Sequence, residues 1–313
     1  MQSLNTIATH QVTKNSLPQI APGVGYLTTV FVNLYFIRAE NNSWILVDTG
    51  LPLQAWRVKA AAQQQFGRHA ARPAAIVLTH GHFDHAGNAL ALAEEWNVPI
   101  YAHRLEMPYL TGKSDYPPQD PTVGGALAEM SRVFPHGGYD FGNRVRELPD
   151  DGSLPELPEW QYLHTPGHTA GHISLFRERD RVLIAGDALA TVNQESPVTL
   201  LTLERELSQP PATFTTDWQA ASDSIYNLAN LRPLVIAAGH GLPISENAAE
   251  QLEIFARNFA PPAHGRYVRA PALTNERGIV ALPPPVADPV GRVVVGATLA
   301  IIAGLLIAQF RKR

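Results

Sequence analysis

The segment Thr79–Gly87, with the sequence THGHFDHAG, constrains this 313-residue chain more than any other part of it. It places three histidines and an aspartate within six residues, directly after the apolar run Ala74–Thr79, which is typical of a short buried strand. A turn at a strand end bends the chain around one point, so side chains grouped there can converge. Because imidazole and carboxylate groups suit Zn, Fe or Mn, the segment predicts a metal site rather than a solvated polar loop.

Three later strand-like pieces end in residues of the same kind. His168 lies in LHTPGHTAGH, Asp187 in IAGDA and His240 in AAGHG, each of them beside a glycine. An imidazole or a carboxylate at the end of a buried strand is costly unless it is paired or bound to a metal. These three residues and the histidine-rich segment are therefore expected to serve one site.

The ordered pattern His-x-His-x-Asp-His, Gly-His, Gly-Asp and Gly-His resembles the metallo-β-lactamase superfamily, and the match runs from about Gly25 to Glu250. The resemblance implies an α+β fold, a four-layer αββα sandwich with two metals at one edge between its sheets. The implied cofactors are two Zn ions, with Fe or Mn as alternatives. It also implies three ligands for a first metal, three for a second and one that bridges both: His80, His82 and His168; Asp84, His85 and His240; and Asp187.

The resemblance further implies metal-dependent hydrolysis by a hydroxide that bridges the two metals. Asp84 is the expected catalytic residue, because it would accept a hydrogen bond from the hydroxide and later pass its proton on. The bridging Asp187 matches the glyoxalase-II-like and lactonase-like branches, whereas true β-lactamases usually lack it. The basic C-terminal pattern of glyoxalase II is missing, and Ala190 stands where lactonases have a tyrosine. The prediction is a glyoxalase-II-like hydrolase that cleaves a small-molecule thioester, ester or lactone.

Two other functions stay open. An iron-dependent sulfur dioxygenase shares this fold and ligand set, and a non-catalytic family member would use the pocket for binding only, although all seven ligand positions are filled. The formal net charge of −4 and the lack of a broad basic footprint disfavour nucleic acid as a partner. The chain has no cysteine, so any metal must be held by His, Asp or Glu.

Several polar residues lie near the expected ligands without matching a ligand position. Asp48, in LVDTG, is expected either to orient a ligand histidine or to cap a turn. His103, His164 and His172 are expected to pack or to form hydrogen bonds beside the metals rather than to bind them.

Residues 1–259 are predicted to form the catalytic domain. Within it, Thr29–Arg38 and Trp44–Val47 read as a β-hairpin. Residues 103–143 are rich in Pro, Gly and Tyr and predict a long surface excursion with a short helix near 126–133, for which we consider the role of a lid. Its four aromatic residues would either line an apolar substrate site or pack the excursion onto the domain: Tyr109, Tyr116, Phe134 and Tyr139.

The C-terminal region predicts a membrane anchor. Residues 260–289 are Pro-rich and are expected to form a linker, and the apolar stretch 290–310 is close to the ~20 residues that span a bilayer as a helix. Its small residues recur at four-residue spacing, which would let two such helices pair into a homodimer. Because Met1–Gln11 does not resemble a secretory signal, the catalytic domain is expected at a membrane but on its cytoplasmic side.

Overall fold

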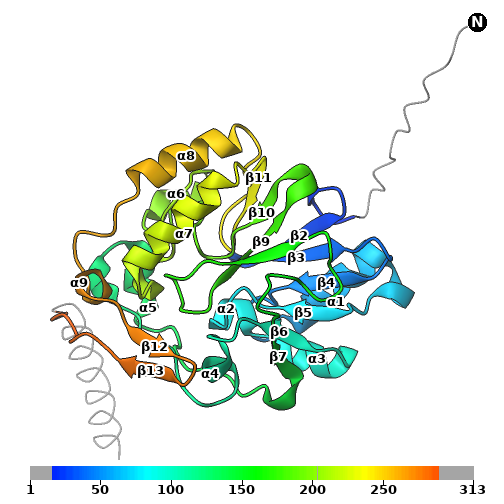
Figure 1. The fold of residues 1–313 in the computed structure, drawn as a ribbon, viewed down its shortest axis with the longest axis horizontal. Coiled ribbons are helices and arrows are strands. Elements are labelled where there is room, and N and C mark those ends of the chain that lie inside the picture. The colour runs from blue at the N-terminus through cyan, green and yellow to red at the C-terminus, as the bar shows by residue number, and fades with distance from the viewer. Residues whose placement is uncertain (1–15, 203, 289–313) are drawn as a thin grey trace, which may run out of the picture.

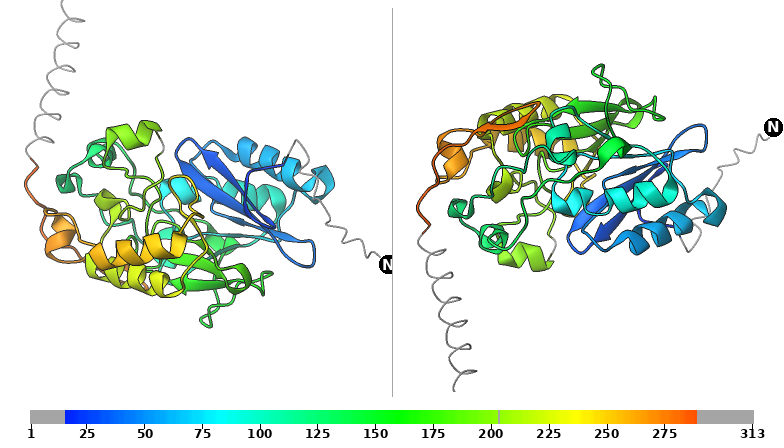
Figure 2. Two further views of the ribbon diagram at one scale, coloured as in Figure 1. Left: turned by 90° about the horizontal axis from the view of Figure 1, so that it is seen from above. Right: turned by 90° about the horizontal axis from the view of Figure 1, so that it is seen from below.

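Two β-sheets lie face to face at the centre of the molecule, and helices cover their outer faces (Figure 1). The computed structural model describes residues 16–202 and 204–288. Across the molecule the layers are α1 with α3, the larger sheet, the smaller sheet, and α7 with α8 (Figure 2). This is the helix–sheet–sheet–helix order that the resemblance implied.

The larger sheet has seven strands, hydrogen-bonded in chain order. Its first four strands are antiparallel, and β4 to β7 run parallel to one another. The strands are β1 Gln19–Ala21, β2 Val24–Thr29, β3 Val32–Arg38, β4 Trp44–Val47, β5 Ala75–Val77, β6 Ile100–Ala102 and β7 Val145–Glu147.

The smaller sheet has four strands in the order β11-β10-β9-β8, and β10 and β11 run parallel. Its strands are β8 Gln161–His164, β9 Ile173–Arg177, β10 Val182–Ile184 and β11 Val235–Ala237. A separate hairpin consists of β12 Leu273–Asn275 and β13 Gly278–Ala281.

The helices fill the connections between these strands. They are α1 Ala55–Phe66, α2 Phe83–Ala86, α3 Ala89–Trp96, α4 Met107–Leu110, α5 Ala126–Ser131, α6 Pro197–Thr202, α7 Trp218–Asn230, α8 Ala248–Asn258 and α9 Arg266–Arg269. Short 3-10 helices cover Arg68–Ala70, Pro121–Val123, Gly142–Arg144, Glu178–Asp180 and Ala212–Phe214.

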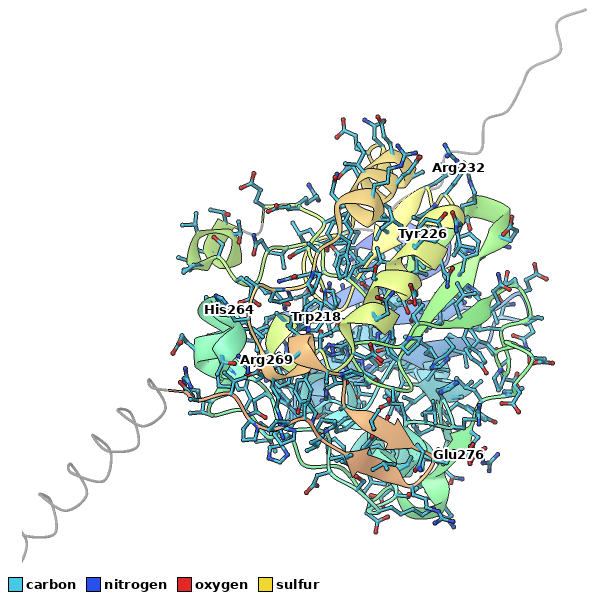
Figure 3. The ribbon with its side chains drawn as sticks, turned by 60° about the vertical axis from the view of Figure 1, so that its left-hand side comes forward. Trp218, Tyr226, Arg232, His264, Arg269 and Glu276 are labelled. Atoms are coloured by element: carbon cyan, nitrogen blue, oxygen red, sulfur yellow. The ribbon has the colours of Figure 1, made fainter. Side chains whose placement is uncertain are left out.

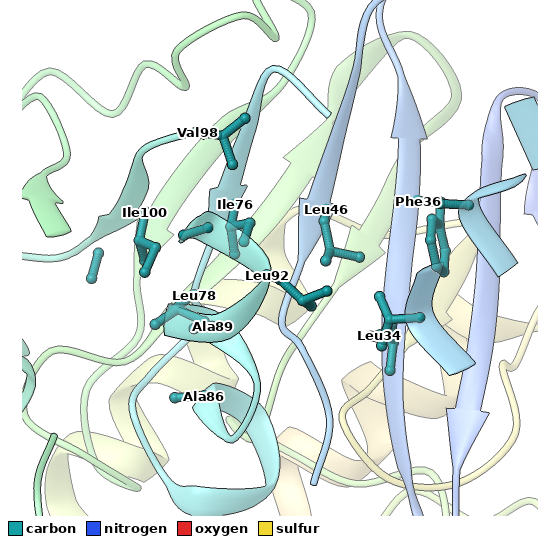
Figure 4. Close-up of a cluster of buried hydrophobic side chains, with 14 of the residues drawn as sticks. Leu34, Phe36, Leu46, Ile76, Leu78, Ala86, Ala89, Leu92, Val98 and Ile100 are labelled. Atoms are coloured by element: carbon teal, nitrogen blue, oxygen red, sulfur yellow. The ribbon is translucent and has the colours of Figure 1, made fainter. Parts of the chain in front are cut away.

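The larger sheet is buried on both of its faces, which explains why β4 is apolar throughout. Successive side chains of a strand point to opposite faces. Thus Phe36 and Leu46 pack under the helices, beside Leu92 of α3 (Figure 4), while Ile37 and Ile45 face the smaller sheet. The apolar packing holds the strand ends in place, and those ends carry the candidate site.

The expectation of a membrane-spanning helix is corrected here. Among residues 16–202 and 204–288, no helix is long and apolar enough to cross a membrane. The longest, α7, has 13 residues, and at about 1.5 Å per residue it covers only about 20 Å of a hydrocarbon layer that is about 30 Å thick. The predicted anchor 290–310 lies outside the described residues. The membrane location, the cytoplasmic orientation and the pairing through an anchor are therefore withdrawn.

The segment 260–288, for which a linker was expected, packs against the excursion 103–143. Tyr267 of α9 is buried, and its hydroxyl donates a hydrogen bond to the Pro118 carbonyl at 2.7 Å. Glu276, at the tip of the β12–β13 hairpin, pairs with Arg104. Figure 3 shows this hairpin and α9 on the same side of the molecule as the start of α7, marked by Trp218.

Candidate metal centre

The carboxyl ends of the strands place the seven candidate ligands at one edge of the two sheets. His80 follows β5, and the chain then turns into the short helix α2, whose first turn is closed by amide hydrogen bonds to the His82 carbonyl. Asp187 and His240 follow the parallel strands β10 and β11, and His168 lies in the turn between β8 and β9. The structure brings all seven residues together in overlapping groups.

The first group contains His80, His82 and His168, which each offer one ligand atom within 4.8 Å of the others. The Nδ1 atom of His82 lies 3.0 Å from Nε2 of His168. Burial and the neighbouring imidazoles lower the pKa of His80 and His168 well below 6.5, and burial lowers that of His82 to about 3. The three rings are therefore neutral near pH 7, which is the form that binds a metal.

The second group contains Asp84, His85 and His240. The Asp84 Oδ2 atom lies 3.5 Å from Nε2 of His240 and 3.8 Å from Nε2 of His85. Burial opposes a charge on His85 and His240, but the nearby carboxylates raise the pKa of both rings. This group thus pairs imidazoles with carboxylates, unlike the first group.

Asp187 lies between the two groups. Its Oδ2 atom is 3.1 Å from Nε2 of His240, 3.4 Å from Nε2 of His85 and 3.6 Å from Nε2 of His168. Burial opposes ionisation of Asp187, but the facing His240 and His85 hold its pKa well below 3.8. One carboxylate oxygen thus faces rings of both groups.

Hydrogen bonds to the outer ring nitrogens fix the orientation of these imidazoles. His85 Nδ1 lies 2.9 Å from Asp48 Oδ2, and the other Asp48 oxygen accepts the Thr79 amide proton at 2.8 Å. His240 Nδ1 lies 3.0 Å from the Phe31 carbonyl oxygen. Each ring then directs Nε2 towards the centre. Of the two roles expected for Asp48, the structure shows the orientation of a ligand-position histidine.

His172 forms a hydrogen bond with the backbone of Asp187. Its Nε2 atom accepts the Asp187 amide proton at 2.8 Å, and Nδ1 lies 3.1 Å from the Thr165 carbonyl oxygen. The other two histidines without a ligand position, His103 and His164, stack on each other with ring centroids 4.2 Å apart.

Glu106 was not singled out from the sequence, yet it joins two of the loops that carry candidate ligands. This fully buried carboxylate accepts the Gly81 amide proton at 3.0 Å and the Gly171 amide proton at 3.0 Å. It also accepts hydrogen bonds from the hydroxyls of Thr169 and Tyr116. Glu106 is one of five acidic residues in the stretch 103–143, and nothing in the sequence marks it for such a role.

Three polar atoms at the centre are buried and have no hydrogen-bond partner in the described part of the chain: His80 Nε2, His85 Nε2 and Asp187 Oδ1. Buried polar groups are nearly always satisfied, so three unpaired atoms in one place need an explanation. All three are ligand atoms of the type that Zn, Fe and Mn prefer. The residues therefore fit a centre that holds metal ions.

A cavity of about 420 Å³ opens over this centre. Of the four excursion aromatics, Phe134 lines the cavity. Tyr109 and Tyr116 stack on each other in the interior, and Tyr139 stacks on Phe141. The excursion therefore contributes one aromatic side chain to the cavity wall, and its other aromatics pack it onto the domain.

Comparison with known proteins places the chain in a family. The family model described as the Metallo-beta-lactamase superfamily matches residues 27–240. A probable metallo-hydrolase of Bacillus subtilis, YflN, is 47% identical over 230 residues, which are 72% of this chain and 87% of the relative.

A second relative matches a shorter stretch of the chain, and a solved structure matches at a lower sequence identity. The hydroxyacylglutathione hydrolase GloC of Haemophilus influenzae is 30% identical over 116 residues, 36% of this chain and 49% of the relative. The crystal structure of a beta-lactamase domain protein from Burkholderia ambifaria shares the fold, with a TM-score of 0.51, 22% identity, and coverage of 78% of this chain and 76% of that one. The matched region contains all seven candidate ligands, and the chain belongs to the metallo-β-lactamase superfamily.

Proposed function

We propose that the protein is a metal-dependent hydrolase that binds two metal ions and cleaves a small-molecule thioester, ester or lactone. One observation carries the proposal: seven His and Asp side chains converge at the floor of a cavity, with three of their buried ligand atoms unpaired. The name of the relative YflN, a probable metallo-hydrolase, supports hydrolysis. The name of GloC supports a thioester among the candidate bonds.

The ligand assignment follows the two groups. His80, His82 and His168 would hold one ion, and Asp84, His85 and His240 the other, with Asp187 shared between them. Bound metal ions of this kind polarise a scissile carbonyl and lower the pKa of a bound water towards neutral. We propose zinc as the metal, because nitrogen and carboxylate donors suit it and the chemistry needs no redox change.

Asp84 is the proposed proton carrier. Its side chain lines the cavity, and burial raises its pKa above 3.8, so it takes up a proton more readily than an exposed aspartate. It would accept the proton of the attacking water and deliver it to the leaving group.

The proposal is tested with the full-length protein loaded with zinc. Metal content is measured by elemental analysis, and hydrolysis of a panel of esters, thioesters and lactones is followed at neutral pH, with oxygen uptake recorded in parallel. We expect about two zinc ions per chain, turnover of at least one class and no oxygen uptake. Two bound ions with no turnover of any class, or oxygen uptake in place of hydrolysis, would contradict the proposal.

A further inference from the structure

We infer that the cavity selects a neutral substrate with an apolar acyl chain and rejects anionic conjugates such as glutathione thioesters. This inference rests on the proposed function, and it concerns the walls of the cavity rather than its metal-binding floor.

The walls of the cavity are mostly apolar. Phe214 lies beside His82, with ring centroids 5.5 Å apart, and Phe31 stacks on His240 at 5.9 Å. Phe134 lies 6.4 Å from Phe214. Aliphatic side chains complete the walls: Val30, Leu127, Met130, Val192 and Leu242. An acyl chain would therefore contact carbon atoms along most of its length.

Among residues 16–202 and 204–288, no lysine or arginine lines the cavity. One guanidinium group contacts the lining from outside: Arg57 donates to the carbonyl of Thr28, a lining residue, and to the Gln54 side chain. A glutathione thioester carries two carboxylates, and burying a carboxylate without a cationic partner is strongly unfavourable. The walls therefore disfavour such a conjugate.

Apart from the candidate metal ligands, the main polar side chain of the cavity walls is the uncharged Gln194. It is buried and lines the cavity, and its Oε1 atom has no hydrogen-bond partner among the residues that the structure describes. Apolar binding sites use a few such groups to fix the orientation of the ligand. Gln194 is positioned to bind one neutral polar group of the substrate.

The mouth of the cavity exposes apolar side chains to solvent. Val30 is 68% exposed and Met130 is 45% exposed, although both line the cavity. Val30 has a φ of 62°, a strained conformation for a β-branched residue, and such strain is found mostly where function requires it. An acyl chain that reaches the mouth would cover both side chains.

The test varies the length of the acyl chain and the thiol carrier of the substrate separately. Acyl thioesters of N-acetylcysteamine, which are neutral, are paired with glutathione thioesters of the same acyl groups, from two to ten carbons. We expect kcat/KM for the neutral series to rise about threefold to fourfold per methylene until the cavity is filled. We expect each glutathione thioester to be at least about tenfold poorer than its neutral partner. A flat chain-length profile, or a preference for the glutathione series, would overturn the inference.

Two lysine variants provide a matched comparison. Met130→Lys places a cation at the cavity wall and should reduce the preference for the neutral series. Val133→Lys adds the same charge three residues further on, at a side chain that is 83% exposed and does not line the cavity, so the preference should stay unchanged. Equal effects of the two variants would contradict the assigned wall.

A binding measurement separates this inference from the proposed hydrolysis. Calorimetry with octanamide, a neutral probe, and with S-octylglutathione requires no turnover. Tighter binding of octanamide, weakened by Phe214→Ala, supports the inference even if no ester is cleaved. Failure of octanamide to bind would overturn it even if hydrolysis is found.

A second inference rests on Glu106. We infer that Glu106 is a positioning residue that fixes the spacing between the loop of His82 and the loop of His168. One of its oxygens accepts the Gly81 amide proton, next to His82, and the other accepts the Thr169 hydroxyl proton at 2.6 Å, next to His168. Among the described residues, no other carboxylate accepts backbone amide protons from both loops.

The surroundings of Glu106 leave little room for change. A side chain at Gly171 would collide with the Glu106 backbone and carboxylate, and one at Gly81 would collide with the Tyr116 hydroxyl that binds Glu106. The Tyr116 ring in turn lies 4.6 Å from the His82 ring. The carboxylate, the tyrosine and the two glycines thus form one packed unit behind the first group of histidines.

The test uses cobalt in place of zinc, because the visible spectrum of cobalt(II) reports the ligand arrangement directly. Glu106→Ala should change the spectrum and weaken cobalt binding about 10- to 100-fold. Glu106→Gln should restore part of the affinity, since it keeps the shape and one acceptor. Arg177→Ala, which removes a buried side chain paired with Asp180 far from both loops, controls for lost stability and should leave the spectrum unchanged. A wild-type spectrum and affinity in Glu106→Ala would overturn the inference, and failure of the wild type to bind cobalt would instead contradict the metal centre.

Discussion

The backbone amide of Asp187 donates a hydrogen bond to the Nε2 atom of His172 at 2.8 Å. His172 is fully buried, and burial lowers its pKa to about 3, so the ring stays neutral and Nε2 keeps its lone pair for this bond. The position of Asp187, which faces both groups of histidines, therefore depends on His172. Both ring nitrogens of His172 are engaged in hydrogen bonds, so neither is free to bind a metal.

Replacing His172 with Ala should destabilise the protein by about 2–4 kcal/mol, because it leaves the buried Asp187 amide without an acceptor and opens a cavity. Metal affinity should also fall about 10- to 100-fold, since the Asp187 carboxylate loses its support. Thermal denaturation and metal titration measure the two effects. His164→Ala, an exposed histidine that bonds to the Ala170 carbonyl, is the control and should change neither by much. Equal losses in both variants would show that His172 has no special role.

The strained turn at Val30 predicts an unusual response to glycine. The Phe31 amide bonds back to the Thr29 carbonyl at 2.8 Å, the pattern of a γ-turn, and Val30 has a φ of 62°. Because glycine adopts positive φ readily, Val30→Gly should leave the free energy of unfolding unchanged or raise it by up to about 1 kcal/mol. Val280→Gly, at a 60% exposed strand position of β13, should lower it by about 1 kcal/mol. Chemical denaturation measures both, and a loss at Val30 as large as that at Val280 would contradict the strain.

Glu195 predicts a pH-dependent term in stability. Burial raises its pKa from 4.5 to about 7, and its Oε2 atom is buried without a hydrogen-bond partner. The folded state therefore holds a proton that the unfolded chain has already lost between pH 4.5 and 7. The contribution to stability is complete below about pH 4.5 and is lost as the pH rises towards 7, by about 1–3 kcal/mol in all.

Glu195→Gln removes this titration. We compare the free energy of unfolding of the variant with that of the wild type at each pH. The difference, variant minus wild type, should rise between pH 4.5 and 7 and stay constant above about pH 8. Chemical denaturation at a series of pH values gives this difference. A difference that is flat across the range would show that the carboxyl group is not buried in the folded state.

The sequence indicated individual strands and the candidate ligands best where a local pattern carried the information. β4, with its WILV run, and the polar residues directly after β5, β10 and β11 are such cases, because apolar runs followed by His or Asp are visible in one short window. The membrane helix was the exception, since an apolar stretch alone does not establish a spanning helix, and the described residues contain none.

Features that depend on distant partners could not be predicted in this way. Glu106 meets Gly81 and Gly171, which lie 25 and 65 residues away in the chain, and no local pattern marks it. The turn at Val30 interrupts what reads as a continuous strand from Thr29, because Val-Phe carries no turn signal. Which excursion aromatic faces the cavity likewise depends on tertiary packing.

The most direct test of the metal centre is the metal content and activity of Asp187→Ala. Asp187 is the carboxylate that faces both histidine groups, so its loss should remove a ligand from each ion. Asp151→Ala, which changes an exposed aspartate bonded only to Ser153 among the described residues, is the matched control.

Elemental analysis of the zinc-loaded wild type and the control should give about two zinc ions per chain, and Asp187→Ala should retain fewer. Its kcat/KM on the best substrate of the panel should fall at least about 100-fold, the loss expected when a metal centre is disrupted. An Asp187→Ala variant that keeps both ions and full activity would contradict a centre in which Asp187 is shared.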